Sequence, residues 1–165
     1  MYSSGYVGIR GRVWKLLLKY TPSNKDQALV IIERKRKEYM KHVGTYLPNF
    51  EIEKIDCESN LKTARIIQVD VKRTAPEIKT LRDERVQKIL TRSLYIWHVK
   101  HPASGYVQGI SDLVVPFFLT YVGEYIPVNL KEVDKPLKLD SVEEETWNYI
   151  EADIYWSTSK MLDSV

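Results

Sequence analysis

Residues 101–118 read HPASGYVQGISDLVVPFF, and this stretch decides how the rest of the chain is organised. His101-Pro102 should end a helix, because proline disfavours helical geometry in the residue before it. Residues 103–105 give no signal for a new helix, and the next apolar segment begins only after Gly109. We therefore predict a glycine-flanked loop that holds a neutral amide, Gln108, between two hydrophobic helices. Loops held by rigid scaffolds are common places for function.

Helical spacing of apolar residues continues on both sides of this loop. It predicts one helix over about residues 81–100 and another over about 109–125. The same spacing predicts three earlier helices and one later helix, over about residues 9–20, 23–46, 61–74 and 142–161. Residues 126–141, charged and proline-containing, read as a flexible connection. No strand pair or repeat is evident, so the predicted fold class is all-α.

Two details of the N-terminal part make sharper predictions. Ser23 can cap the second helix, with Asp26 three residues later in a variant of the capping box. The first helix should bury one apolar stripe, which consists of Ile9, Val13, Leu16, Leu17 and Tyr20.

Composition excludes several classes of protein. The chain has 165 residues, 44% of them hydrophobic and 28% charged, as expected of a globular domain with a real core. Residues 1–50 are basic and residues 124–165 acidic, which does not resemble the concentrated basic face of a nucleic-acid binder. Cys57 is alone and no segment is apolar enough to span a membrane. These features predict a cytoplasmic protein that does not bind nucleic acid.

Most catalytic patterns also fail. Ser157-x-x-Lys160 matches a known hydrolase motif by letter but lacks its companion motifs, and we expect it on the helix surface. His98 and His101 could share a helix face, yet no third ligand lies nearby in the sequence, so no metal site is expected. There is no glycine-rich phosphate loop, so the chain should not bind nucleotide by itself.

Three short patterns remain, and they occur in order. The first is Arg10-x-x-x-Trp14. A tryptophan in the core with the stem of an arginine packed beside it is common in proteins, so packing alone can account for this pattern. The second is Ile67-x-x-Asp70-x-x-Arg73, followed by Thr74. Here Asp70 and Arg73 either pair on one helix face or leave Arg73 projecting outward where the helix ends. The third is Tyr106-x-Gln108, followed by Gly109, in the loop described above.

Together these patterns resemble the TBC domain, the family of Rab GTPase-activating proteins. The family pattern is Arg-x-x-x-Trp, then Ile-x-x-Asp-x-x-Arg, then Tyr-x-Gln, and the surrounding residues IRGRVWKLLL (9–18), DVKRTAPE (70–77) and 101–118 match as well. The third motif looks most like the Golgi-associated branch of the family. The resemblance implies that Arg73 is an arginine finger and Gln108 a glutamine finger, both offered in trans to a Rab GTPase.

The resemblance also assigns supporting roles. It implies that Asp70 and Arg10 position the loop of Arg73, paired with each other, and that Tyr106 meets the switch surface of the Rab. Trp14 is expected to pack. Supporting or partner-binding roles also fall on Ile67, Thr74 and Gly109. GTP and Mg²⁺ would arrive with the Rab, so no cofactor and no hydrolytic activity of the chain's own are expected. Peripheral association with Golgi or vesicle membranes is implied.

The resemblance covers residues 1–165 but only the first part of a TBC domain. The sequence lacks the Gly-Ile-Pro residues that usually precede the first motif in the family. The resemblance also implies that the C-terminal subdomain is largely absent. Apolar helix faces, such as that bearing Trp147 and Ile150, should then be exposed and favour self-association. The leading hypothesis is a GTPase activator. The alternative is a non-catalytic Rab-binding or scaffolding helical module.

Overall fold

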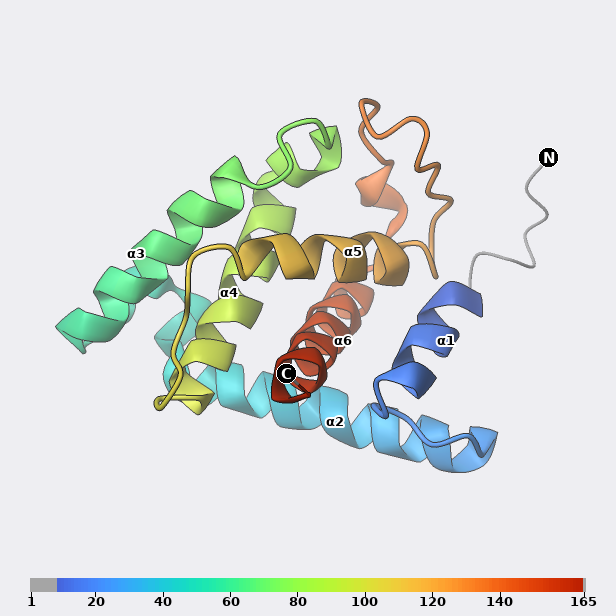
Figure 1. Cartoon of the computed structure of the whole chain (residues 1–165), viewed down its shortest axis with the longest axis horizontal. Coiled ribbons are helices and arrows are strands. Elements are labelled where there is room, and N and C mark those ends of the chain that lie inside the picture. Colours follow the sequence, from blue (N-terminus) through green and yellow to red (C-terminus); the bar gives the residue numbers. More distant parts are fainter. Residues whose placement is uncertain (1–8, 165) are drawn as a thin grey trace.

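A computed structural model describes residues 9–164, which form α-helices joined by loops and short 3₁₀ turns, with no strand in this range. The prediction of an all-α fold is confirmed. The helices are α1 (Ile9–Leu17), α2 (Lys25–Tyr46), α3 (Glu58–Arg73), α4 (Glu84–Lys100), α5 (Ser111–Val122) and α6 (Glu144–Asp163) (Figure 1). No helix in this range is long and apolar enough to cross a membrane.

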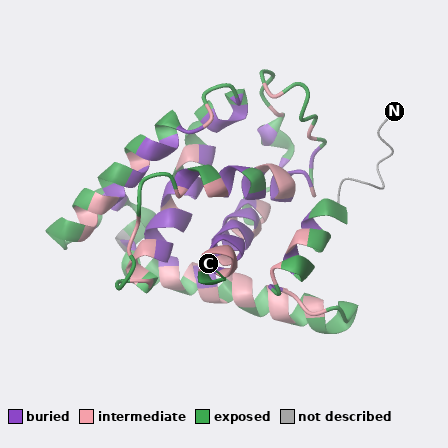
Figure 2. Ribbon diagram, in the orientation of Figure 1, coloured by how far each residue is buried: buried purple, intermediate pink, exposed green. Residues whose placement is uncertain are grey.

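The last helix, α6, is the centre of the fold. It packs against α2, α4 and α5, while α3 packs mainly on α4 and α1 packs on α5 (Figure 1). Half of the residues of α6 are buried, including the unbroken run 150–155, whereas α3 buries only four of its 16 residues (Figure 2). The consequence is a molecule with two ends, α1 at one and α3 at the other, joined through α5 and the central helices.

The ends of the helices differ by a few residues from the predicted ones. Asn24, not Ser23, caps α2, because its side chain accepts hydrogen bonds from the amides of Asp26 and Gln27 at 3.0 and 3.1 Å. The helix predicted from residue 81 begins instead at Glu84. Residues 79–82 form a 3₁₀ turn, after which the side chain of Asp83 caps α4.

The prediction that α1 buries an apolar stripe is wrong. Ile9, Val13, Leu16 and Leu17 are all more than 40% exposed, and Tyr20, which is buried, lies beyond the end of the helix. The buried face of α1 carries Gly11 and Lys15 instead. The reason is polar: the ammonium group of Lys15 is drawn inward by two carboxylates.

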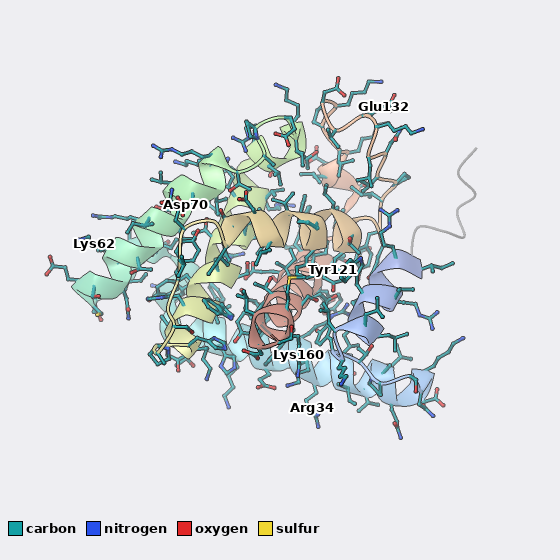
Figure 3. The ribbon with its side chains drawn as sticks, in the orientation of Figure 1. Arg34, Lys62, Asp70, Tyr121, Glu132 and Lys160 are labelled. Carbon is teal, nitrogen blue, oxygen red and sulfur yellow. The ribbon has the colours of Figure 1, made fainter. Side chains whose placement is uncertain are left out.

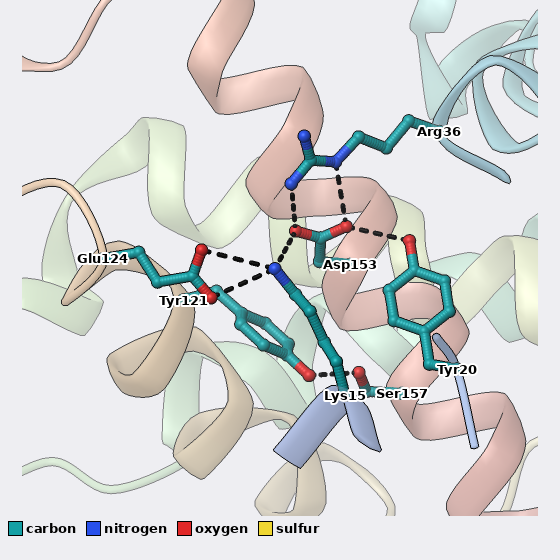
Figure 4. A network of polar contacts seen from close by, with 7 residues as sticks. All are labelled: Lys15, Tyr20, Arg36, Tyr121, Glu124, Asp153 and Ser157. Carbon is teal, nitrogen blue, oxygen red and sulfur yellow. Dashed lines mark hydrogen bonds and ion pairs between the residues drawn. The ribbon is translucent and has the colours of Figure 1, made fainter. Parts of the chain in front are cut away.

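These carboxylates belong to a buried polar network between α1, α2, α5 and α6 (Figure 4). Nζ of Lys15 donates to Oε1 of Glu124 at 3.0 Å and lies 3.2 Å from Oδ2 of Asp153. Arg36 makes a bidentate pair with Asp153, at 3.1 and 2.7 Å, and the hydroxyl of Tyr20 donates to the same carboxylate at 2.9 Å. Burial raises the pKa of Glu124, and Lys15 opposes this rise. Hydrogen-bonded pairing of this kind is what allows charges to be buried.

Two further predictions about α6 are wrong. Trp147 and Ile150 are 3% and 0% exposed, because they belong to the hydrophobic core, so they form no surface for self-association. Ser157 is buried and shares a hydrogen bond with the hydroxyl of Tyr121, so the Ser-x-x-Lys pattern does not lie on the helix surface. Self-association itself stays a prediction.

The connection over residues 126–141 contacts the folded core. Its Val133 carbonyl accepts a hydrogen bond from the amide of Lys79 at 3.0 Å, and its Leu137 amide donates to Oγ1 of Thr80 at 2.9 Å. Ile126 and Leu139 are buried. The flexibility of this segment stays a prediction.

Candidate functional site

The C-terminal end of α3 holds the first candidate residue. Arg73 is the last residue of α3 and is exposed, whereas Ile67 and Asp70 on the same helix are buried. Ile67 anchors α3 in the core, and Asp70 is 7% exposed. Arg73 therefore leaves a firmly packed helix at the point where the helix stops.

The chain leaves α3 through a fixed turn. Thr74 has an extended backbone and a buried side chain, whose hydroxyl donates to the carbonyl of Asp70 at 2.7 Å and lies 2.9 Å from the hydroxyl of Ser111. Ala75 follows with a φ of +42°, in the left-handed region that non-glycine residues rarely adopt. Ser111, the first residue of α5, is a contributor that the sequence did not reveal.

The loop between α4 and α5 holds the second candidate, Gln108, with an exposed side chain. Gly105 and Gly109 on either side of it have φ values of +64° and +101°, which glycine adopts without strain. The amide of Tyr106 donates to Nδ1 of His98 at 3.0 Å, so a side chain of α4 fixes the loop two residues before Gln108. This role of His98 has no signal in the sequence patterns.

One hydrogen bond joins the two candidate positions. The hydroxyl of Tyr106 donates to Oδ2 of Asp70 at 2.8 Å, and Figure 3 labels Asp70 on α3 beside the loop that leads into α5. Burial, and then this hydrogen bond, raise the pKa of Tyr106. Arg73 follows Asp70 by three residues and Gln108 follows Tyr106 by two, so this bond joins the helix that ends in Arg73 to the loop that carries Gln108.

Asp70 forms neither the ion pair with Arg10 that the resemblance implies nor the pair with Arg73 that was one of two alternatives. Among residues 9–164, neither Arg10 nor Arg73 pairs with the carboxylate, whose side-chain partner is the hydroxyl of Tyr106. Arg10 is exposed on α1, at the opposite end of the molecule from α3 (Figure 1), because α1 packs on α5 and not on α3. The prediction that Arg10 positions the loop of Arg73 by direct contact is therefore wrong.

The tryptophan of the first motif packs. Trp14 is partly buried and meets Phe117 of α5 edge-to-face, with ring centroids 6.0 Å apart. Its contact holds α1 on α5, far from the two candidate residues.

The described part of the chain, residues 9–164, contains no group of three or more His, Cys, Asp or Glu residues placed to hold a metal ion. In the pair His98 and His101, Nδ1 of His98 accepts the amide of Tyr106, and Nδ1 of His101 lies 2.8 Å from the carbonyl of Trp97. What the arrangement offers is an exposed positive charge and an exposed neutral amide, each on an anchored stretch of backbone. Such groups act on whatever molecule docks against them.

Comparison with known proteins places this surface in context. Residues 8–164 match the family model described as the Rab-GTPase-TBC domain. The chain is 41% identical over 157 residues to TBC1 domain family member 22A of Mus musculus, which covers 95% of this chain and 29% of that protein. It is 38% identical over 166 residues to GTPase-activating protein GYP1 of Saccharomyces cerevisiae, covering 93% and 23%.

A solved structure agrees with these relatives. The crystal structure of the Ypt/Rab-GAP domain of Gyp1p superposes with a TM-score of 0.84 at 36% identity, over 96% of this chain and 48% of that chain. This chain thus spans less than a third of the length of the curated relatives named above, and about half of the solved domain.

Proposed function

This chain belongs to the Rab-GTPase-TBC domain family, and from that premise we propose that it accelerates GTP hydrolysis by a Rab-family GTPase. Arg73 and Gln108 enter the active site of the GTPase in trans. The observation that carries this proposal is the hydrogen bond from Tyr106 to Asp70, which joins the helix that ends in Arg73 to the loop that carries Gln108.

The arginine supplies charge where charge develops. In GTP hydrolysis negative charge builds on the phosphate oxygens in the transition state, and a guanidinium inserted there accelerates the reaction about 10³–10⁵-fold. At 1.36 kcal/mol per factor of ten, this amounts to about 4–7 kcal/mol. Arg73 meets the structural requirement for such a finger, because its side chain is exposed while its helix is anchored by Ile67 and Asp70.

The glutamine supplies hydrogen bonds of both kinds. A neutral amide can accept a hydrogen bond from the attacking water and donate one to a phosphate oxygen. Gln108 stands in a loop whose turns use two positive-φ glycines. The hydrogen bond to His98 restrains this loop and so limits the conformational freedom lost on docking. Gly109 serves this loop geometry, and Thr74 and Ile67 hold the end of α3. Tyr106 fixes the loop through its hydroxyl and offers the exposed part of its ring to the switch surface of the Rab.

GTP and Mg²⁺ belong to the Rab partner in this proposal. The chain contributes positioned side chains only. We place this activity at Golgi or vesicle membranes, with the chain as a peripheral protein, because the third motif looks most like the Golgi-associated branch of the family.

The test is single-turnover GTP hydrolysis by a panel of Rab proteins in the presence of this chain. Arg73→Ala should lower the stimulation by about 10³-fold or more, and Gln108→Ala by about 10²-fold. Arg65→Ala is the matched control, since Arg65 is an exposed arginine on the same helix, two turns earlier. Its stimulation should stay at the wild-type level.

All three variants should unfold within about 0.5 kcal/mol of the wild type, because the altered side chains are exposed. Full activity of Arg73→Ala would overturn the assignment of the finger. Rab binding without stimulation by the wild-type chain would support the non-catalytic binding module instead.

A further inference from the structure

A second arginine, Arg82, binds the main chain on both sides of Arg73. The guanidinium of Arg82 donates one hydrogen bond to the carbonyl of Lys72 and another, of 2.8 Å, to the carbonyl of Thr74. These carbonyls belong to the residues immediately before and after Arg73. On the basis of the function proposed above, we propose that Arg82 is a positioning residue, which acts on hydrolysis by fixing the backbone from which Arg73 projects.

Arginine is suited to this contact. Its planar guanidinium carries several N–H donors in a rigid fork, so one side chain can reach two carbonyl oxygens at once. The last carbonyls of a helix have no partner within the helix, and a positive charge there is favoured by the helix dipole. A lysine at this position would reach one of the two oxygens at a time, because its ammonium group is a point donor.

The turn that Arg82 grips needs such support. Ala75 has a φ of +42° immediately before Pro76, a conformation that an L-residue rarely adopts and that a following proline further disfavours. Strained backbone of this kind persists only where neighbouring contacts hold it. Thr74 supplies some of these contacts from within the turn, and the guanidinium of Arg82 supplies two from outside it.

Arg82 is itself held in place. It ends the 3₁₀ turn over residues 79–82, in which Thr80 and Leu81 are 3% and 1% exposed, and Asp83 then caps α4. The guanidinium therefore links the start of α4, a core helix, to the exit of α3. Because its donors are directed at main-chain oxygens, Arg82 supports Arg73 without replacing it at the phosphate.

The experiment compares Arg82→Gln and Arg82→Lys in Rab-stimulated hydrolysis, using the Rab of the panel that the wild-type chain stimulates most. Arg82→Gln should lower the maximal rate at saturating chain by about ten- to a hundredfold, with the half-saturating concentration unchanged, because misplacing a catalytic group costs rate more than binding. Arg82→Lys should recover part of the rate. Lys79→Gln is the matched control, since Lys79 is an exposed cation of the same 3₁₀ turn, and it should keep the full rate.

A double-variant cycle separates positioning from direct action. If Arg82 works only through Arg73, adding Arg82→Gln to Arg73→Ala should cause no further loss. A further loss of the same size in the double variant would overturn the proposal, since Arg82 would then act on the Rab or on the phosphate directly. A wild-type rate for Arg82→Gln would overturn it while leaving the finger role of Arg73 intact, and full activity of Arg73→Ala would overturn both.

A second measurement does not depend on hydrolysis. Amide hydrogen exchange in residues 70–78 should be faster in Arg82→Gln than in the wild type, because the exit of α3 loses two hydrogen bonds, and unchanged in Lys79→Gln. Equal exchange in all three proteins would show that Arg82 does not hold this turn.

Discussion

Arg36 and Arg73 show how differently the two ends of this molecule use the same side chain. The side chain of Arg36 on α2 points into the protein, where it forms a bidentate pair with the buried carboxylate of Asp153. Arg73 ends α3 with its side chain exposed, and none of the ion pairs described among residues 9–164 involves it. A charge that is paired inside the protein holds the fold, whereas a charge left at the surface remains available to a partner.

The same contrast holds for the surroundings of these residues. Lys15 of α1, Glu124 of the turn after α5 and Asp153 of α6 join these three parts of the chain through buried ion pairs. Around Arg73 and Gln108 the buried polar groups hold the backbone, and the two candidate side chains themselves are exposed. Changes at the first end should therefore affect stability, and changes at the second end should affect activity.

The largest expected effect lies in the buried network. Asp153→Asn removes the carboxylate that Arg36, Lys15 and Tyr20 share, and breaking a buried ion pair from one side costs about 3–5 kcal/mol. Denaturant-induced unfolding measures the loss. Asp163→Asn, on an exposed residue of the same helix, is the control and should shift the free energy of unfolding by less than about 0.5 kcal/mol. Equal shifts for the two variants would remove the contrast between the two ends.

An intermediate effect is expected where the two candidate residues are joined. Tyr106→Phe leaves the buried carboxylate of Asp70 without its hydroxyl donor, at a cost of about 1–3 kcal/mol. It should also lower the stimulation of Rab hydrolysis, because the loop of Gln108 is no longer tied to α3. Tyr149→Phe removes the same kind of hydrogen bond, from a tyrosine to the exposed Glu145 at 2.7 Å.

Tyr149→Phe should leave both the free energy of unfolding and the stimulation near wild type. If Tyr106→Phe also stays near wild type in both measurements, the hydrogen bond to Asp70 does not organise this surface. The proposed connection between the two candidate positions would then be wrong.

The smallest expected effect is a dependence on pH. Burial lowers the pKa of His98, and Nδ1 of its neutral ring accepts the amide of Tyr106. Because the pKa is lower in the folded than in the unfolded state, the unfolded state takes up the proton first as the pH falls. This contribution to stability is complete above the unfolded-state pKa of about 6.5 and is lost as the pH falls through the folded-state value.

Unfolding of the wild type and of His98→Asn between pH 7.5 and 5.5 measures this contribution, since asparagine keeps an acceptor but does not titrate. The variant should lose less stability over this interval. Burial also lowers the pKa of His42, so His42→Asn is needed to account for its separate share. An unchanged slope in His98→Asn would show that the loop of Gln108 is not held by a titrating group.

Much of the fold followed from local pattern. Periodic apolar residues predicted the helices to within a few residues, and Pro76 and Pro102 marked two of the ends correctly. The first helix was misread because its buried face is polar: Lys15 faces inward toward Glu124. Gly11 belongs to the same arrangement, since a Cβ at this position would lie 1.7 Å from Oε1 of Glu124. Neither requirement is visible within α1 itself.

The candidate site was predictable in part. Arg73 and Gln108 were identified from the ordered motifs and the resemblance they carry, and the structure shows both as exposed residues on anchored supports. The partner of Asp70 was predicted wrongly, because spacing along a helix cannot reveal a hydroxyl that arrives from a loop 36 residues later. The contributions of His98, Ser111 and Arg82 were likewise invisible, since each acts through a main-chain or side-chain group of another element.

The sequence by itself determined the helices and their breaks, because these depend on residues within a few positions of one another. Its three ordered motifs, through the family that they resemble, also singled out Arg73 and Gln108. Only the tertiary structure decided which charged side chains form ion pairs in the interior of the protein. Lys15 and Arg36 meet Asp153 across more than a hundred residues of chain, while Arg73 meets no such partner among the residues described. Which cations stay at the surface depends on how the helices pack, and packing is a property of the whole chain.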